Sequence, residues 1–351
     1  MKIMHVIKHS WRSNGHVHVA VDLACAQADA GHEVTFAHAH GSYDDLLRAH
    51  GVTIATVPEA STLLDVLRSE RALLGVARAA RPEVVHAHMM SSAVLAHPVS
   101  KVVRAPLVTT MHNSFDSHSW LMRLGTVVVA VSEAERQRLI GRGFPARKVV
   151  CVLNGAVASP REALPDDLSI GSLAGPCVVS LCGLHGRKAV GDIITAFSKA
   201  QPAAPAWQLN IIGSGPDRDR LEGLARDLGL SASVHFTGPS LTPWRLLEQA
   251  DVFASASLDE PFGLSLAEAR AAGCAVVATA VGGVPEVLEQ GRAGQLVPVS
   301  APEAMADVLR RLMTDRDELA RWRARARENA DYFSVRRMAE DYDRVYQSVV
   351  G

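Results

Sequence analysis

Short apolar runs alternate with longer amphipathic stretches along this chain of 351 residues. The runs are rich in valine and other β-branched residues and are bounded by turn residues, which predicts buried strands. In the first half we predict strands at Lys2–Ile7, Glu33–Ala37, Thr53–Val57, Val84–Ala87, Leu107–Met111, Val127–Val131 and Val149–Leu153. Helices are predicted between them at His16–Ala30, Tyr43–His50, Leu63–Ala80 and Ser132–Ile140. This repeated order is typical of a mostly parallel sheet with helices on both faces.

The pattern stops between Ala158 and Pro176, a segment with three prolines and two glycines that we interpret as a linker, and then starts again. The next predicted strands are Cys177–Cys182, Trp207–Ile212, Val234–Thr237, Val252–Ala256, Ala275–Thr279 and Gly294–Val297. The predicted helices are Val190–Ala200, Asp217–Leu228, Pro243–Ala250, Leu264–Ala272, Val284–Gln290 and Ala301–Met313, followed by a helical tail from Glu318 to Val350.

The fold class that follows is α/β, with two doubly wound Rossmann-like domains that face a central cleft. We expect the first domain to cover residues 1–160 and to be completed by a C-terminal helix at 336–351. The second domain is expected to cover residues 161–335. In such sheets ligands bind at the carboxyl ends of the strands, so the site is expected there.

Composition excludes several classes of function. The net charge of −1 gives no basic field for nucleic acid. The five cysteines are scattered and odd in number, which favours reduced thiols in a cytoplasmic protein over disulfides or a zinc site. The N-terminal apolar run is shorter than a signal peptide requires, and no stretch approaches the ~20 apolar residues of a membrane span.

A peripheral contact with the inner face of a membrane remains open at the predicted helix Leu63–Ala80. Arginines lie at positions 68, 71, 78 and 81 among leucines, so this helix has both the charge and the apolar surface for an anionic bilayer. The alternative is a packed helix with a solvated arginine face.

Two carboxylates carry the clearest chemical signal. Glu260 lies in a Pro-Phe-Gly turn, and Glu268 lies on the body of the predicted helix Leu264–Ala272, which Gly273 ends. Two acids at this spacing can bind separate hydroxyl groups of one ligand, while amides at the helix start face an anion. The segment therefore indicates a polyol that carries phosphate.

A set of motifs in a fixed order resembles the family-4 retaining glycosyltransferases, which have the GT-B fold and use nucleotide-sugar donors. Besides the two-glutamate segment, the motifs are Asn14-Gly15, Ala30–Val34, Thr109–Asn113, Ala130–Ala134, Leu153–Ala156, Arg187-Lys188, Ile212–Pro216 and Ala280–Glu286. The resemblance covers essentially the whole chain.

The resemblance implies roles for the residues around the two glutamates. Glu268 is expected to bind the ribose hydroxyls of the nucleotide, and Glu260 the hydroxyls of the transferred sugar. The amides of Phe262, Gly263 and Leu264 are expected against sugar and phosphate. The alternative for Glu268 is a solvated helix face.

Two cations are implied for the diphosphate. Lys188, with Arg187 before it, matches the family lysine that stabilises negative charge on the leaving group. The family usually has an arginine where this chain has Leu184, so Arg187 or His185 is expected to replace it. The alternative is that these are ordinary loop charges.

Two glycine-containing loops are implied near the donor. Gly213, Ser214 and Gly215 are expected to line the nucleotide, with a simple strand-to-helix turn as the alternative. Gly15 matches a glycine loop near the donor phosphates, and Asn14 before it can tolerate a left-handed backbone.

In the first domain, His112 is implied to contact the transferred sugar without acting as a nucleophile. Asn14, His16 and Asn113 are candidates for acceptor contact, with a helix-surface residue as the alternative interpretation of His16. We find no recognisable metal-binding histidine triad and no Asp-x-Asp pair where a metal-dependent transferase would need one, so neither a metal nor a cofactor is expected.

The implied reaction moves a hexosyl unit from a UDP- or GDP-linked sugar to an acceptor hydroxyl, with retention of configuration. The acceptor is expected to be a sugar, a lipid-linked molecule or a small molecule, in the synthesis of a bacterial glycan, glycolipid or glycosylated metabolite. The alternatives are a non-catalytic nucleotide-sugar-binding protein and a GT-B epimerase or phosphorylase.

Overall fold

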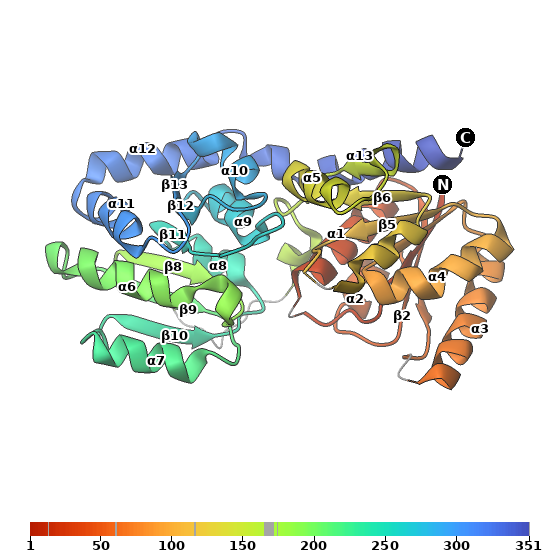
Figure 1. The fold of residues 1–351 in the computed structure, drawn as a ribbon, viewed down its shortest axis with the longest axis horizontal. Coiled ribbons are helices and arrows are strands. Elements are labelled where there is room, and N and C mark those ends of the chain that lie inside the picture. The colour runs from red at the N-terminus through yellow and green to blue at the C-terminus, as the bar shows by residue number, and fades with distance from the viewer. Residues whose placement is uncertain (13, 60–61, 116, 165–171, 174, 351) are drawn as a thin grey trace. The chain divides into compact units, whose positions relative to one another are not determined.

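The structure, a computed structural model, describes residues 1–350 except 13, 60–61, 116, 165–171 and 174. The chain divides into two compact units, which are described separately (Figure 1). Unit 1 consists of Met1–Ala163 together with Phe333–Gly351, and unit 2 consists of Leu164–Tyr332. Part of the predicted linker, Ala158–Pro176, lies outside the described residues, because residues 165–171 and 174 are not among them.

Unit 1 contains a seven-stranded sheet in the order β3-β2-β1-β4-β5-β6-β7, and every pairing in it is parallel. The strands are β1 (Lys2–Val6), β2 (Glu33–His38), β3 (Thr53–Thr56), β4 (Val84–His88), β5 (Leu107–Met111), β6 (Val127–Ala130) and β7 (Val149–Cys151). All seven predicted strands are confirmed, with ends that differ by at most two residues. The central strands β1, β4 and β5 are buried at almost every position, which suits strands covered on both sides.

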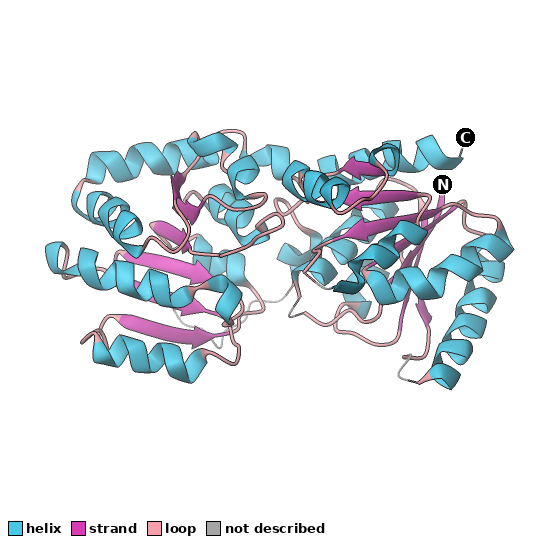
Figure 2. Cartoon of the chain, in the orientation of Figure 1, coloured by secondary structure: helices cyan, strands magenta, loops and turns pink. Residues whose placement is uncertain are grey.

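Helices cover this sheet (Figure 2). They are α1 (Gly15–Asp29), α2 (Asp44–Ala49), α3 (Leu63–Ala80), α4 (Met90–Val103), α5 (Glu133–Gly141) and α13 (Val335–Val350). The sequence analysis did not predict α4, which contains Pro98, a residue that is unfavourable inside a helix. Burial of Ala93, Ala96 and Val99 on one face of α4 offsets the hydrogen bond that the proline removes.

Unit 2 contains a six-stranded parallel sheet in the order β10-β9-β8-β11-β12-β13. The strands are β8 (Cys177–Leu181), β9 (Gln208–Ile212), β10 (Val234–Gly238), β11 (Val252–Ser255), β12 (Ala275–Thr279) and β13 (Gln295–Val297). The helices are α6 (Val190–Ala200), α7 (Arg218–Asp227), α8 (Pro243–Leu247), α9 (Leu264–Ala272), α10 (Val284–Val287), α11 (Pro302–Thr314) and α12 (Arg316–Arg327). The expected two doubly wound α/β folds are confirmed.

Two predicted helices are interrupted. The stretch Val284–Gln290 was expected to be one helix, but α10 stops at Val287 because Glu289 and Gln290 have φ of 51° and 57°. The tail from Glu318 to Val350 was expected to be helical throughout. Instead α12 ends at Arg327, Asn329 takes φ 56°, and a 3-10 turn follows before α13.

Each unit also buries an arginine that holds several elements together. In unit 1, Arg161 donates from Nε to both carboxylate oxygens of Asp22 on α1, at 3.0 and 3.1 Å. In unit 2, Arg270 on α9 is fully buried. Its guanidinium donates to the carbonyls of Ala326, Val287 and Glu328 and to the carboxylate of Glu289. Arg270 therefore connects α9 to the ends of α10 and α12.

Replacement of Arg270 by methionine is expected to lower the free energy of unfolding by about 3–5 kcal/mol, because Glu289 and three carbonyls lose a buried donor. Urea unfolding followed by circular dichroism measures this loss. Arg292→Ala is the matched control, since Arg292 pairs with the same Glu289 at 2.6 Å but its side chain is 78% exposed. Its unfolding midpoint should stay close to that of the wild type. Equal losses in the two variants would contradict the role given to Arg270.

Candidate active site

The loops after β8 and β11 meet at one point of unit 2. Lys188 lies in a 3-10 turn, Gly186–Lys188, that follows β8, and Glu260 lies between β11 and α9. Lys188 Nζ donates to Glu260 Oε2 at 2.5 Å, and the two side chains are 17% and 14% exposed. Two of the residues that the sequence analysis assigned to the donor are therefore in direct contact, although 72 positions separate them.

Arg187 supports the same loop. Its Nη1 donates to the carbonyl of Asp259 at 3.1 Å, and its own carbonyl accepts from the amide of Leu258 at 2.8 Å. Leu184 is fully buried in the core of unit 2, so that position places an apolar side chain inward. Burial, together with the neighbouring Arg187 and Lys188 charges, lowers the pKa of His185 from its usual 6.5. His185 is therefore largely neutral at pH 7, which leaves Arg187 and Lys188 as the cations here.

Two glycines, Gly282 and Gly283, pack against the backbone carbonyl of Glu260. The amide of Gly283 donates to the carbonyl of Glu260 at 2.9 Å. Gly282 has φ 51°, and a Cβ there would lie 2.0 Å from the same carbonyl oxygen. The sequence analysis included Gly282 and Gly283 in a motif but gave them no role. The signal that pointed to them was the doubled glycine immediately before a helix.

The loop of Gly213, Ser214 and Gly215 packs against the loop that follows β8. A Cβ at Gly213 would lie 1.9 Å from the carbonyl oxygen of Cys182, and one at Gly215 would lie 2.2 Å from that of Leu184. The amide of Leu184 donates to the carbonyl of Ser214 at 2.9 Å. Both glycines are therefore required by this close packing, which brings the loop beside the one that carries Lys188.

Helix α9 has the predicted bounds. Gly263 before it has φ 100° and Gly273 after it has φ 79°, so both ends depend on a left-handed glycine. Leu264 is the first helical residue, and Phe262 before it is buried. Glu268 is half-buried on the second turn, so it is not on a fully solvated face.

In unit 1 the candidate residues gather at the carboxyl ends of β1, β4 and β5. His112 follows β5 and is 8% exposed, and its Nε2 lies 3.1 Å from Nδ1 of His88. The ring of His16, near the start of α1, lies 5.9 Å from the ring of His112, and Asn113 is half-buried beside it in the chain. Asn14 has φ −126° and ψ 124°, which is an extended backbone and not a left-handed one.

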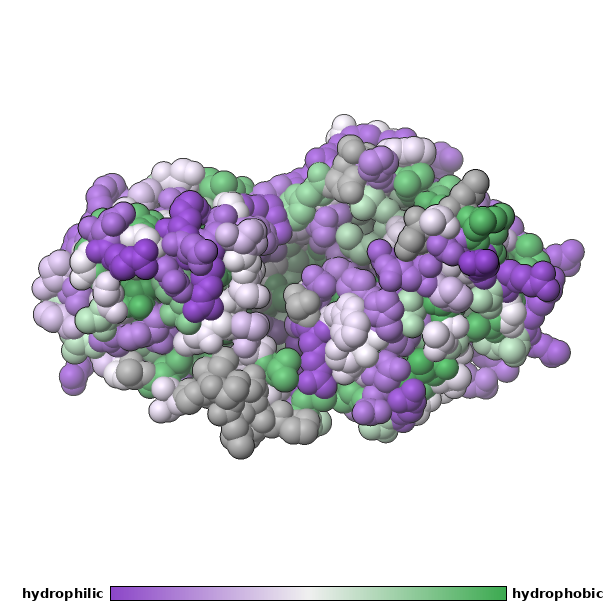
Figure 3. Space-filling view, turned by 90° about the horizontal axis from the view of Figure 1, so that it is seen from below, coloured by the Kyte–Doolittle hydropathy of each residue, from purple (hydrophilic) through white to green (hydrophobic). Residues whose placement is uncertain are grey.

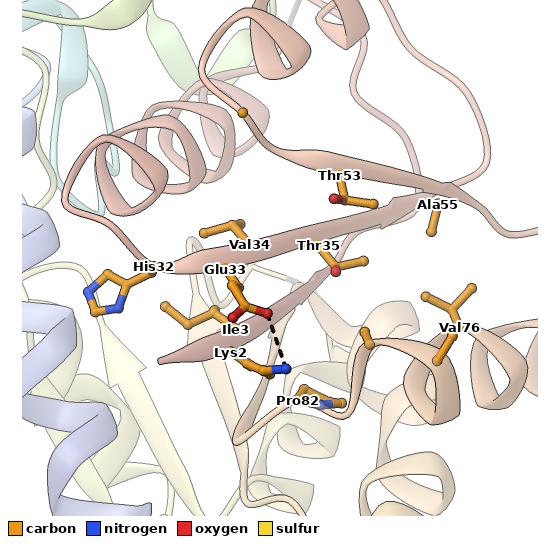
Figure 4. A pocket seen from close by; sticks show the side chains of 13 residues that line it. Lys2, Ile3, His32, Glu33, Val34, Thr35, Thr53, Ala55, Val76 and Pro82 are labelled. Carbon is orange, nitrogen blue, oxygen red and sulfur yellow. Dashed lines mark ion pairs between the residues drawn. The ribbon is translucent and has the colours of Figure 1, made fainter.

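A cavity of about 320 Å³ opens at these strand ends. It is lined by Ile7, Lys8, His9, His16, His88, Met89, Met90, Ser91 and His118. A larger cavity of about 590 Å³ lies at the amino ends of β1, β2 and β3, beside α3 (Figure 4). Lys2 and Glu33 form an ion pair of 3.2 Å in it. Since doubly wound sheets bind ligands at the carboxyl ends, the smaller cavity is the better candidate.

Burial favours the neutral form of six histidines in this region. Burial lowers the pKa of His5 and of His16 to about 4 and that of His18 to about 3. It also holds the pKa of His86, His88 and His112 well below 6.5.

Three histidines are close enough to be considered as metal ligands. Within the described part of the chain, nitrogens of His5, His86 and His88 lie within 4.8 Å of one another. However, His86 Nδ1 is 2.7 Å from the hydroxyl of Tyr346 and His86 Nε2 is 2.7 Å from that of Thr110. His5 and His88 are likewise hydrogen-bonded to each other at 3.0 Å. The cluster is thus a satisfied hydrogen-bond network as it stands.

The surface of each unit mixes hydrophilic and hydrophobic residues, as the face in Figure 3 shows. On α3, Leu73 and Ala77 are buried, whereas the arginines at 68, 71, 78 and 81 are exposed together with Leu64 and Leu67. The buried side is that of a packed helix, but the exposed arginines and leucines on the other side do not distinguish the two interpretations of this helix. Among the described residues, no helix combines the length and the apolar character needed to cross a membrane.

Comparison with known proteins gives matches over most of the chain. The model of glycosyltransferase family 4 matches residues 13–158, and that of the glycosyl transferases group 1 matches residues 175–329. The N-acetyl-alpha-D-glucosaminyl L-malate synthase of Bacillus anthracis is 27% identical over 294 residues, which cover 78% of this chain and 77% of that protein. The exopolysaccharide phosphotransferase SCO2592 of Streptomyces coelicolor is 35% identical over 201 residues, 55% of this chain, but the match spans only 21% of that protein.

Solved structures share the fold. The structure of Anabaena Alr3699/HepE in complex with UDP and glucose has a TM-score of 0.82 and 21% identity, and the match covers 99% of this chain and 100% of that one. The fold is thus that of the GT-B glycosyltransferases. The chain belongs to the family-4, group 1 glycosyltransferases, which are retaining enzymes that use nucleotide-sugar donors.

Gly282→Ala is expected to displace the backbone of Glu260. The Glu260 carboxylate, which pairs with Lys188, would then move as well. Whichever of UDP and GDP the protein binds should then bind at least tenfold more weakly, which is about 1.4 kcal/mol. Isothermal titration calorimetry measures this change. Gly291→Ala is the matched control, because Gly291 also has positive φ (92°) but its nearest neighbour atom would be 3.9 Å from the new Cβ. Similar affinities in the two variants would contradict the steric argument.

The buried histidines predict that stability falls in mild acid. Their pKa values are lower in the folded than in the unfolded protein, so their contribution is complete above pH 6.5 and is lost as the pH falls from 6.5 toward 4. Each such histidine lowers the free energy of unfolding by up to about 1.4 kcal/mol per pH unit in that window. Urea unfolding at pH 7, 6 and 5 tests this, and His86→Phe should reduce the slope. A stability that is constant over this range would refute it.

Proposed function

We propose that this chain transfers a hexosyl unit from a UDP- or GDP-linked sugar to an acceptor hydroxyl, in the synthesis of a bacterial glycan, glycolipid or glycosylated metabolite. The observation that carries the proposal is the contact between Lys188 and Glu260. It brings a cation for a diphosphate and an acceptor for sugar hydroxyls together at the strand ends of one unit, where this class of sheet binds ligands.

Each donor-binding residue has a distinct task in this proposal. Lys188, assisted by Arg187, stabilises the negative charge that develops on the departing diphosphate. Glu260 accepts hydrogen bonds from hydroxyls of the transferred sugar, and Glu268 accepts them from the ribose. The amides of Gly263 and Leu264, at the start of α9, face sugar and phosphate. Burial of Arg270 keeps α9, and therefore Glu268, in place.

The ion pair has a consequence for the chemistry. In the partly buried pair, Glu260 holds the ammonium group of Lys188 in one place, so the cation is already oriented for the diphosphate. The bond between the anomeric carbon and the diphosphate oxygen breaks as the acceptor oxygen attacks from the same face. An oxygen of the diphosphate takes the acceptor proton, so no enzymic nucleophile is required. The protein contributes positioning and electrostatic stabilisation.

The acceptor side is assigned to unit 1. The cavity at the carboxyl ends of β1 and β4 is lined by His16, which follows Asn14 closely in the sequence. His112 and Asn113 come directly after the adjacent strand β5. His112 is assigned to a hydroxyl of the transferred sugar. The neutral histidines provide hydrogen bonds without charge, which suits an uncharged hydroxyl acceptor.

The first experiment identifies the donor and then the reaction. A thermal-shift screen of nucleotide sugars should show stabilisation by the true donor, since a ligand of the folded state raises its melting temperature. Release of nucleoside diphosphate from that donor is then measured with and without sugar, lipid-linked and small-molecule acceptors. Release that requires an acceptor supports the transferase. Conversion without an acceptor indicates an epimerase, a requirement for inorganic phosphate indicates a phosphorylase, and binding without turnover indicates a non-catalytic protein.

Variants of the donor site should separate binding from catalysis. Lys188→Met is expected to lower kcat about 10²–10³-fold, as loss of one charge-stabilising group at a transition state does. Glu268→Ala is expected to lower kcat/KM about tenfold or more through loss of charged hydrogen bonds to ribose. Glu248→Gln is the control, because this unit 2 carboxylate is 57% exposed and pairs only loosely with Arg245, at 3.8 Å. A Glu268→Ala protein with full activity would exclude the proposed donor site.

A further inference from the structure

A series of hydrogen-bonded polar side chains, most of them buried, leads to His112 within unit 1. Gln27 Nε2 donates to Asp343 Oδ1 at 3.4 Å, and Gln27 Oε1 lies 2.8 Å from His5 Nε2. His5 Nδ1 lies 3.0 Å from His88 Nε2, and His88 Nδ1 lies 3.1 Å from His112 Nε2. The rings come from β1, from β4 and from the residue after β5, whereas Gln27 and Asp343 come from α1 and α13.

Asp343, at one end of this series, determines which atom donates in each hydrogen bond. A carboxylate only accepts hydrogen bonds, so the amide nitrogen of Gln27 faces Asp343 and the amide oxygen faces His5. His5 must then donate from Nε2. Since a neutral imidazole has a proton on one nitrogen only, Nδ1 of His5 is an acceptor.

The same rule repeats at each following ring. The bare Nδ1 of His5 requires a proton on Nε2 of His88, and the bare Nδ1 of His88 requires a proton on Nε2 of His112. Nδ1 of His112 is therefore left as an acceptor. Among the described residues, no group hydrogen-bonds to that atom.

Burial keeps every ring neutral, which the argument requires. His5 and His88 have no exposed surface, and the pKa of each is depressed by burial. A protonated ring would place two donors against one another at a 3.0 or 3.1 Å contact and would bury a charge.

We propose that Asp343, Gln27, His5 and His88 are positioning residues that fix His112 in its Nε2-protonated tautomer and so present the Nδ1 lone pair to a sugar hydroxyl. The catalytic meaning of this arrangement rests on the proposed function, whereas the tautomer itself does not. A bare nitrogen carries partial negative charge, which stabilises the positive charge that develops on the sugar ring as the diphosphate departs. An N–H at the same place would oppose it.

Zinc binding by His5, His86 and His88 is the competing interpretation of this cluster. A metal would need bare nitrogens at the positions that now carry the hydrogen bonds, so it would displace Thr110 or Tyr346 from His86 and separate His5 from His88. The hydrogen-bonded arrangement satisfies all three rings without this rearrangement.

Nuclear magnetic resonance of the full chain with ¹⁵N-labelled histidine distinguishes the tautomers, because protonated and bare ring nitrogens have well-separated shifts. The wild type should show His112, assigned with a His112→Gln variant, protonated at Nε2 and bare at Nδ1. Gln27→Met has a similar volume but removes the hydrogen-bond acceptor of His5. The direction of the hydrogen bonds from His5 to His112 should then reverse, which places the proton of His112 on Nδ1. His88→Phe should leave a mixture of tautomers.

The matched control is His86→Phe. It removes an equally buried imidazole whose ring centroid lies 4.1 Å from that of His88 but which is not part of the chain, so the tautomer of His112 should not change. A wild-type proton on Nδ1, a tautomer that is unchanged in both Gln27→Met and His88→Phe, or one zinc ion per purified molecule would overturn the proposal. If Gln27→Met fails to fold, His88→Phe decides the question.

Kinetics test the catalytic meaning separately. With an active donor and acceptor, Gln27→Met should lower kcat at least tenfold and change KM less than twofold, because the lone pair acts on transition-state charge. A reversed tautomer with unchanged kcat would refute the catalytic role. If no transfer is detected at all but the tautomers behave as expected, the proposed function is wrong. The proposal that Asp343, Gln27, His5 and His88 fix the tautomer of His112 is then still supported.

Discussion

Parallel strand pairing is the constraint on which the rest of this structure depends. Every pairing in both sheets is parallel, so the carboxyl ends of all strands in a unit lie at one edge. The loops that follow these ends must then lie side by side, however far apart they are in the sequence. Lys188 and Glu260 meet for this reason in unit 2, and so do the histidines near the carboxyl ends of β1, β4 and β5 in unit 1.

Buried polar side chains inside the units fix how the helices and loops are arranged at these edges. A buried charge or imidazole is costly unless its hydrogen bonds are made, so each one restricts the arrangement of the elements around it. Arg270 restricts α9 through four acceptors, and Arg161 restricts α1 through Asp22. The histidine chain restricts the orientation and the tautomer of His112. In the proposed mechanism, the function thus depends on residues that have no contact with substrate.

The strands were predictable because their signal is local. Runs such as Leu107–Met111 and Ala275–Thr279 are rich in β-branched residues and buried at every position, and their predicted bounds match the structure. The prediction failed where long-range packing overrode a local signal. Helix α4 forms around Pro98 because one face is buried, and the tail divides at Asn329 although its composition favours a continuous helix. The candidate site residues were found from motifs, but the role of Gly282 was not, because its need for glycine comes from the carbonyl of Glu260.

By itself, the sequence determined the alternation of strands and helices, the two-part α/β architecture and the family, because periodicity and motif order are properties of neighbouring positions. The tertiary structure alone decided which distant side chains are in contact. The pairing of Lys188 with Glu260, the four acceptors of Arg270 and the link from Asp343 to His112 join residues separated by tens to hundreds of positions. No local pattern encodes such contacts, since they depend on strand order, on register and on the demand that buried polar atoms be hydrogen-bonded.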